Sequence, residues 1–246
     1  MSGRRPARTA KGKRGGARRG PVEAVDWPPR LRGVVVDAEK MRIHGYLAAT
    51  DLSRHYSFAE VVLLALTGVP PEPAVGALFA RALVASMPVA VGDAPAHAAL
   101  LARLTGARAP SVAGIAALVA AQGVDALAGT RDALAAWQER GGALPRSLRG
   151  SSRRDVAVRR ALRDVARQGG LVVPALERAA SAEAAVTASL VACGLDAPWQ
   201  LAAAVTMASL PCSLAEAFAS GGVDLRSYPM TLPAFEYTEA PREDAR

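Results

Sequence analysis

The chain has 246 residues, of which 51% are hydrophobic and 21% charged, and its formal net charge is +8. This hydrophobic content is enough for a sizeable core, so disorder is excluded for most of the chain, and the length allows one large domain or two small ones. Residues 1–20 contain eight basic residues and no acid, which leaves 22 Lys and Arg against 22 Asp and Glu in residues 21–246. The excess charge therefore comes from the N-terminus, and the body is formally neutral.

The first 22 residues consist largely of Gly, Arg and Pro with almost no bulky apolar side chains. Such a composition cannot offset the entropy of ordering, so we predict a disordered basic tail over residues 1–22 and a helical domain over residues 23–246. Eight cations can neutralise several phosphates, which makes nucleic-acid binding possible through this tail alone; the other interpretation is a solubilising or targeting tail. No apolar run follows the basic residues, so we expect no secretory signal and a cytoplasmic protein.

The predicted elements begin with a short strand or hairpin at Val34–Val36, a β-branched run. Ser57 and Glu60 have the spacing of a capping box before the apolar run Val61–Leu66, and Gly68 is positioned to end that helix. Further helices, each bounded by Gly or Pro, are predicted at Glu72–Ser86, Ala94–Leu104, Ser111–Gln122 and Ala126–Glu139. Val112–Val124 is the longest apolar stretch, and we interpret it as a buried helix rather than a membrane span.

The longest polar break in the body is Gly141–Arg154, which we interpret as a linker or a site loop. After it, helices are predicted at Asp155–Gln168, Pro174–Cys193, Pro198–Ser209 and Cys212–Ser220. The fold class is therefore all-α, with a possible small subdomain around residues 141–195.

Three consecutive motifs carry a family resemblance: MRIHGY at 41–46, DLSRHYSFAEV at 51–61 and LTGVP at 66–70. In order and spacing they resemble the N-terminal signature of citrate synthases. Weaker, collinear similarity continues through DAPAHAALLARLTG at 93–106, the helical segments at 111–122, 159–169, 188–195 and 210–218, and LPAFEY at 232–237. The chain thus resembles the citrate synthase and citryl-CoA lyase family over residues 34–237, which implies a multi-helix, citrate synthase-like fold.

That family uses two histidines and an aspartate for enolisation and carbonyl polarisation, and arginines to hold the substrate carboxylates. The positions that resemble these sites have lost most of the groups. Gly123–Gly129 and Gly150–Ala157 contain no histidine, although Asp155 matches a family aspartate. Ala184–Thr187 contains no carboxylate, and Ala208–Cys212 contains no arginine. The resemblance therefore implies the scaffold of the family without its chemistry.

The remaining chemical groups are few. All three histidines lie before residue 98. We interpret His44 as a turn or interface residue and His55 as a capping or packing residue. His97 has no Cys or acidic residue at metal-ligand spacing, so no metal site is predicted. Asp125 is the candidate substitute base, and Arg153 and Arg154 are the candidates for residual anion binding. The two cysteines, Cys193 and Cys212, lie in apolar helical patterns and predict no disulfide.

Three functions are compatible with these observations. The first is a non-catalytic scaffold or regulatory subunit that forms a homodimer, or a heterodimer with an active paralogue, as family members are dimers. The second is an acyl-CoA and keto-acid enzyme, carbon-carbon bond-forming or citryl-CoA-cleaving, with a rebuilt site that accepts a CoA thioester. The third is nucleic-acid association through residues 1–22. We favour the first, and expect no cofactor and no membrane association.

Overall fold

The computed structural model describes residues 33–219. The chain divides into two compact units, Met1–Val34 and Val35–Arg246, and the elements below belong to the second. The predicted tail at residues 1–22 and the family-like motif at 232–237 lie outside the described residues.

The described part begins with a three-stranded antiparallel sheet of very short strands: β1 (Val36–Asp37), β2 (Arg42–Ile43) and β3 (Tyr46–Leu47). The β2–β3 turn has positive φ at both central residues, 46° at His44 and 88° at Gly45, as a two-residue hairpin turn requires. The His44 ring lies beside the end of the next long helix, with Nε2 3.4 Å from the carbonyl oxygen of Ala65. The predicted N-terminal hairpin is thus confirmed, with one extra strand.

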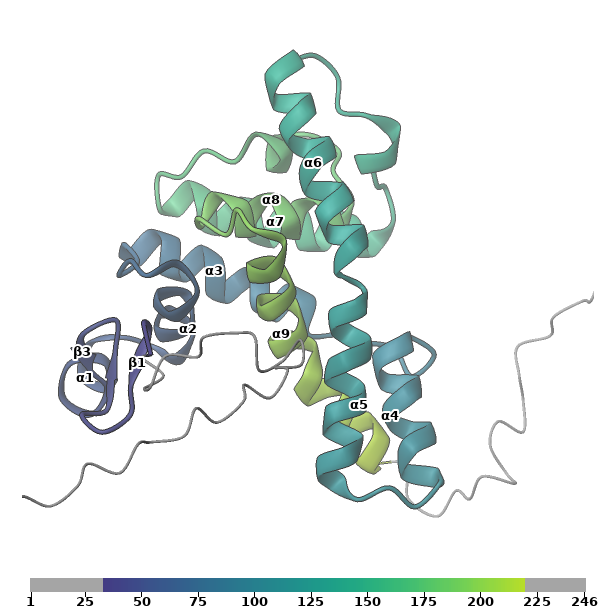
Figure 1. Cartoon of the computed structure of the whole chain (residues 1–246). Helices are drawn as coiled ribbons and strands as arrows, with labels where there is room; N and C mark the ends of the chain where they lie inside the picture. The colour runs from purple at the N-terminus through teal and green to yellow at the C-terminus, as the bar shows by residue number, and fades with distance from the viewer. Residues whose placement is uncertain (1–32, 220–246) are drawn as a thin grey trace, which may run out of the picture. The chain divides into compact units, whose positions relative to one another are not determined.

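The rest of the described chain is helical (Figure 1). A π-turn, η1 (Ala48–Leu52), and a single turn, α1 (Ser53–His55), lead into eight longer helices. These are α2 (Phe58–Thr67), α3 (Pro73–Ser86), α4 (Ala94–Leu104), α5 (Ala109–Gln122), α6 (Val124–Arg140), α7 (Arg153–Gln168), α8 (Ala182–Ala192) and α9 (Pro198–Ala219). Two short 3₁₀ turns, η2 (Arg146–Leu148) and η3 (Pro174–Glu177), flank α7. The all-α prediction is confirmed.

Local capping signals set several of these boundaries. Ser57 and Glu60 form the predicted capping box at α2, where the Ser57 main-chain nitrogen donates to Glu60 Oε2 at 2.7 Å. Gly68 ends α2 with φ 78°, a left-handed conformation that favours glycine. Ser152 and Ser181 cap the N-terminal ends of α7 and α8. Each serine side chain accepts a hydrogen bond from a main-chain nitrogen in the first turn of its helix.

Two predicted helix boundaries are wrong. The helix expected over Pro174–Cys193 is interrupted, because Arg178–Ser181 is not helical and its main chain pairs with the loop before α7. Conversely, the two helices expected over Pro198–Ser209 and Cys212–Ser220 are one helix, α9, which continues through Pro211. Pro211 has no N–H to donate to Met207. The hydroxyl of the buried Ser213 donates to the Ser209 carbonyl at 3.1 Å just beyond it.

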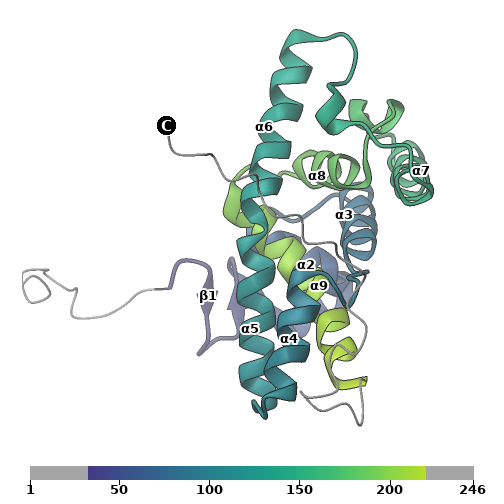
Figure 2. The same cartoon turned by 90° about the vertical axis from the view of Figure 1, so that its right-hand side faces the viewer.

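The described residues form two hydrophobic clusters, and α9 contributes to both. The larger cluster joins α3, α6, α7 and α8 to the first half of α9, with Phe79, Leu162 and Leu190 fully buried. The smaller cluster lies between α4, α5 and the second half of α9, around Leu100, Val112 and Ala217. In Figure 2, α4 and α5 stand side by side with α9 crossing toward them.

Helix α5 differs from its prediction as a buried helix. It continues almost directly into α6, and the stretch Ala109–Arg140 is one of two described stretches, with Pro198–Ala219, that by length and composition alone could cross a bilayer. In α9 this composition reflects its place in both clusters. In α5 only Val112 and Ala116 are fully buried, because a single face of the helix contacts α4 and α9.

Candidate ligand cleft

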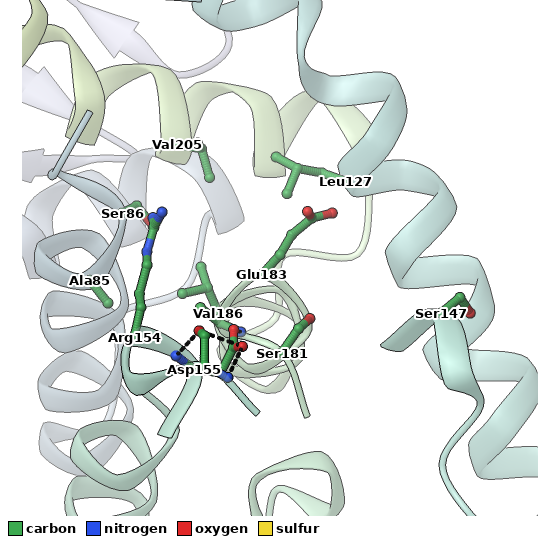
Figure 3. Close-up of a pocket in the computed structure, with 12 residues that line it drawn as sticks. Ala85, Ser86, Leu127, Ser147, Arg154, Asp155, Ser181, Glu183, Val186 and Val205 are labelled. Atoms are coloured by element: carbon green, nitrogen blue, oxygen red, sulfur yellow. Dashed lines mark hydrogen bonds between the residues drawn. The ribbon is translucent and has the colours of Figure 1, made fainter. Parts of the chain in front are cut away.

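A cleft of about 620 Å³ lies where the N-terminal ends of α7 and α8 meet the end of α3, the start of α6 and the middle of α9 (Figure 3). Its lining is mostly small or polar: Ala85, Ser86, Leu127, Ser147, Ser152, Arg154, Asp155, Ser181, Ala182, Glu183, Val186 and Val205. The cleft thus includes the loop that the sequence analysis interpreted as a linker or site loop.

Asp155 binds the beginnings of two helices at once. Its Oδ2 accepts hydrogen bonds from the Ser152 main-chain nitrogen at 2.9 Å and the Ser152 hydroxyl at 2.7 Å, which completes a capping box at α7. Its Oδ1 accepts from the Ala182 main-chain nitrogen at 2.7 Å, in the first turn of α8. Both carboxylate oxygens are therefore already engaged by the protein.

The loops on either side of Asp155 are paired through their main chains. The Gly150 nitrogen donates to the Ala179 carbonyl at 3.0 Å, and the Ser181 nitrogen donates to the Leu148 carbonyl at 2.8 Å. Arg159 of α7 adds a bond from Nη1 to the Ala180 carbonyl at 2.7 Å. The floor of the cleft is thus held by contacts between segments about thirty residues apart in the chain.

Only glycine fits at position 150, because atoms of Asp155 and Ser181 lie very close to it. A Cβ at position 150 would lie 2.5 Å from Cγ of Asp155 and 2.6 Å from Cα of Ser181. Real Cβ atoms essentially never come so close to main-chain atoms, so only glycine lets the two loops and the carboxylate meet.

These contacts also set the charge state of Asp155. The hydrogen bond from the Ser152 hydroxyl, followed by that from the Ala182 main chain, lowers the pKa of the Asp155 carboxyl below its ordinary value of 3.8. Asp155 is therefore ionised at neutral pH and poorly suited to accept a proton from a substrate. Its role in this structure is that of a helix-capping anion.

The two candidate anion-binding arginines point in different directions. Arg154 lines the cleft and, on its other side, a second depression of about 600 Å³ that includes Asp93, Cys212 and Glu216. Arg153 lines a separate groove on the outer face of α7, with Val156 and Arg160. The structure therefore brings only Arg154 to the cleft, where its exposed guanidinium makes no hydrogen bond or ion pair with any described residue.

Glu183 is a cleft carboxylate that the sequence analysis missed. It lies in the first turn of α8, one residue before the segment Ala184–Thr187 in which a carboxylate was sought. Its Oε1 accepts a hydrogen bond from the Thr130 hydroxyl of α6 at 2.7 Å. Figure 3 shows its carboxylate turned toward Leu127, whereas Arg154 extends toward Ser86. Ser181 is the sequence signal that could have placed Glu183 here. A serine at this position favours a helix start, and a helix that starts there has Glu183 in its first turn.

Asp125 belongs to the first turn of α6, but its side chain is not among the described atoms. Leu127, two residues further along the same helix, lines the cleft. The suggestion that Asp125 is a substitute base stays a prediction.

None of the three histidines in the sequence lines the cleft. His44 lies in the β2–β3 turn, His55 ends α1, and His97 belongs to α4. Within residues 33–219, no group of three or more His, Cys, Asp or Glu side chains is arranged to hold a metal ion, and Cys193 and Cys212 are both free thiols.

Comparison with known proteins reveals a structural likeness. No family model matches the chain, and no curated protein matches it significantly. Among solved structures, the citryl-CoA lyase of Hydrogenobacter thermophilus is similar with a TM-score of 0.51 and 16% sequence identity, over 83% of this chain and 92% of that one. The fold is citrate synthase-like. At this level of identity the likeness concerns the fold alone, and it agrees with the architecture that the sequence motifs implied.

Proposed function

We propose that this protein is a non-catalytic relative of the citrate synthase-like enzymes that acts by association, as a scaffold or regulatory subunit paired with itself or with an active paralogue. The observation that carries the proposal is the state of Asp155, the carboxylate that the sequence resemblance retained. Its two oxygens cap α7 and α8, so the group is used in holding the cleft together.

The chemistry of the family requires several groups in one place. Enolisation of a thioester needs a base and, at the same time, a donor that stabilises the developing oxyanion. Among the described lining residues, the ionisable groups are Asp155, Arg154 and Glu183. Asp155 is committed to capping and Glu183 is bonded to Thr130 at an exposed position. No imidazole is present to supplement them, because every histidine lies on another part of the fold.

A rebuilt catalytic site is the competing interpretation, and it makes specific demands on the same cleft. Arg154 would hold a substrate carboxylate, and Glu183 or Asp125 would act as the base. These groups would also govern binding of a CoA thioester in the cleft. The proposal and its competitor therefore differ in whether Arg154, Glu183 and Asp125 affect a measurable turnover.

The decisive experiment follows thiol release from acetyl-CoA with oxaloacetate, and citryl-CoA cleavage, by the purified full chain. We expect rates equal to those of buffer, with an authentic citrate synthase as the positive control. Turnover that disappears in Glu183→Gln or Asp125→Ala, but persists in a variant of the outer-face arginine, Arg153→Ala, would overturn the proposal.

The association itself is tested by recovering the full-length protein from its native source at its natural abundance. We expect a citrate synthase-like partner, or a second copy of the chain, in stoichiometric amount. Recovery as a monomer with no such partner would remove the mechanism that we propose.

A further inference from the structure

The cleft at the start of α7 and α8 has two charged groups that the described residues leave available to a ligand. The exposed guanidinium of Arg154 makes no hydrogen bond or ion pair with any described residue. Glu183 accepts the Thr130 hydroxyl through Oε1, at 2.7 Å, and no described residue bonds its Oε2. Asp155 adds no free group, because hydroxyl and main-chain donors occupy both of its oxygens. A ligand in the cleft therefore meets the charges of Arg154 and Glu183.

These two charges lie on opposite sides of the cleft. Arg154 extends toward Ser86 at the end of α3, whereas the carboxylate of Glu183 is held to α6 by its hydrogen bond. Val186 and Val205 line the space between the two charged ends (Figure 3). The cleft thus offers a positive end, an apolar middle and a negative end.

This arrangement disfavours ligands that carry charge of one sign. A dicarboxylate would bring its second carboxylate to Glu183, and a diamine would bring its second ammonium group to Arg154, so that like charges repel in both cases. An uncharged ligand would gain an ion pair from neither side chain. The cleft volume of about 620 Å³ is that of a small-molecule site. The complementary ligand is therefore small and carries one charge of each sign.

We propose that the cleft binds a small zwitterion, with its carboxylate at Arg154, its ammonium group at Glu183 and a short aliphatic chain between them. The Arg154 guanidinium donates parallel hydrogen bonds to the ligand carboxylate, and the ligand ammonium group donates to Oε2 of Glu183. Val186 and Val205 pack against the methylene groups. Linear ω-amino acids have this order of groups. Such binding does not depend on the proposed association, so the two can fail separately.

The exposure of both charged side chains limits the affinity. Arg154 and Glu183 are each exposed, so solvent and salt screen the ion pairs that they make with the ligand. We expect a dissociation constant on the order of 1 mM, which increases with ionic strength.

The experiment is isothermal titration calorimetry of the full chain with small probes. γ-Aminobutyrate, δ-aminovalerate and ε-aminocaproate vary the separation of the two charges, whereas valerate and pentylamine each keep only one of them. We expect the tightest of the three zwitterions to bind at least about fivefold more tightly than valerate or pentylamine, because it alone uses both side chains. Glutarate has a second carboxylate in place of the ammonium group, and glycine has adjacent charges; both should bind more weakly than that zwitterion.

Two variants separate the ends of the site. Arg154→Met should reduce the affinity of the tightest zwitterion to that of pentylamine, and Glu183→Gln should reduce it to that of valerate. Arg153→Met, on the outer face of α7, and Glu139→Gln, at an exposed position in the last turn of α6, are the matched controls and should bind as the wild type does. Unchanged thermal unfolding shows that each variant is folded.

Several results would overturn this assignment. Valerate or glutarate that binds as tightly as the zwitterions would mean that the cleft recognises a carboxylate alone. Glycine that binds equally well would contradict the separation of the charges. Binding that Arg154→Met and Glu183→Gln both leave unchanged would lie outside the cleft, and the absence of zwitterion binding at about 10 mM would remove the site altogether.

Discussion

The carboxylate of Asp155 accepts a hydrogen bond from the main-chain nitrogen of Ala182 at 2.7 Å, across 27 residues of sequence. The same carboxylate closes the capping box of its own helix through Ser152. One side chain thus fixes the start of α7, the start of α8 and the cleft between them. This double contact gives Asp155 a structural role in a loop that resembles a catalytic loop in sequence.

Replacing Asp155 should therefore destabilise the protein rather than change an activity. We expect Asp155→Ala to lower the free energy of unfolding by about 2–3 kcal/mol, because helix caps and hydrogen bonds to charged groups are lost together. Urea unfolding monitored by circular dichroism measures this change. Asp164→Ala is the control from the same helix. Its carboxylate makes two long ion pairs, both at 3.8 Å, with the exposed Arg160 and the partly buried Arg163, and its removal should have a smaller effect than that of Asp155.

The lowered pKa of Asp155 predicts how stability depends on pH. Its folded pKa lies below the ordinary 3.8, so its contribution is fully present above pH 3.8 and is lost as pH falls through the lower folded value. Unfolding free energies measured between neutral pH and acid should thus fall more steeply for the wild type than for Asp155→Asn. Parallel profiles for the two proteins would show that the capping contacts do not favour the ionised form.

Gly150 should be intolerant of even one added carbon. We expect Gly150→Ala to cost about 1–3 kcal/mol of stability, because its Cβ would collide with Asp155 and with the main chain of Ser181. Gly129, within α6, offers the opposite case: a Cβ there has open space, and Gly129→Ala should stabilise the protein by about 1 kcal/mol through helix propensity. Thermal unfolding of both variants measures the contrast, and equal shifts in the same direction would contradict it.

The two free thiols should differ in reactivity. Burial raises the pKa of the Cys193 thiol to about 12, and its Sγ lies 3.6 Å from the Val75 carbonyl, whereas Cys212 lines an open depression. A chromogenic aromatic disulfide at mildly alkaline pH should titrate one thiol per native chain and two after unfolding. Cys212→Ser should abolish the native reaction, and a fast reaction that survives this substitution would place Cys193 within reach of solvent.

The same burial predicts a loss of stability in strong alkali. The folded pKa of Cys193 is raised above the ordinary 9.0, so its contribution is complete below pH 9.0 and declines as pH rises toward 12. Cys193→Ala should remove this part of the decline.

Interactions between residues close in sequence determine several helix boundaries of this protein. The capping box of Ser57 and Glu60, the stop at Gly68 and the bounds of Ala94–Leu104 were all predicted correctly, because each depends on contacts within one or two helical turns. The motifs between residues 41 and 70 also implied the citrate synthase-like fold, which the structural likeness confirms at the level of architecture. The sequence alone also shows that the chain has three histidines and that none of them lies after residue 97.

Only the tertiary structure decided the rest. The interruption at Arg178–Ser181 depends on main-chain pairing with Leu148–Gly150, and the single helix through Pro211 depends on packing in two clusters; neither partner is near in sequence. The separation of Arg153 from Arg154, and the arrival of Glu183 in the cleft, follow from how α7 and α8 begin. These helix boundaries and the composition of the cleft depend on contacts between segments that are distant in sequence. The order of residues alone does not specify which segments meet.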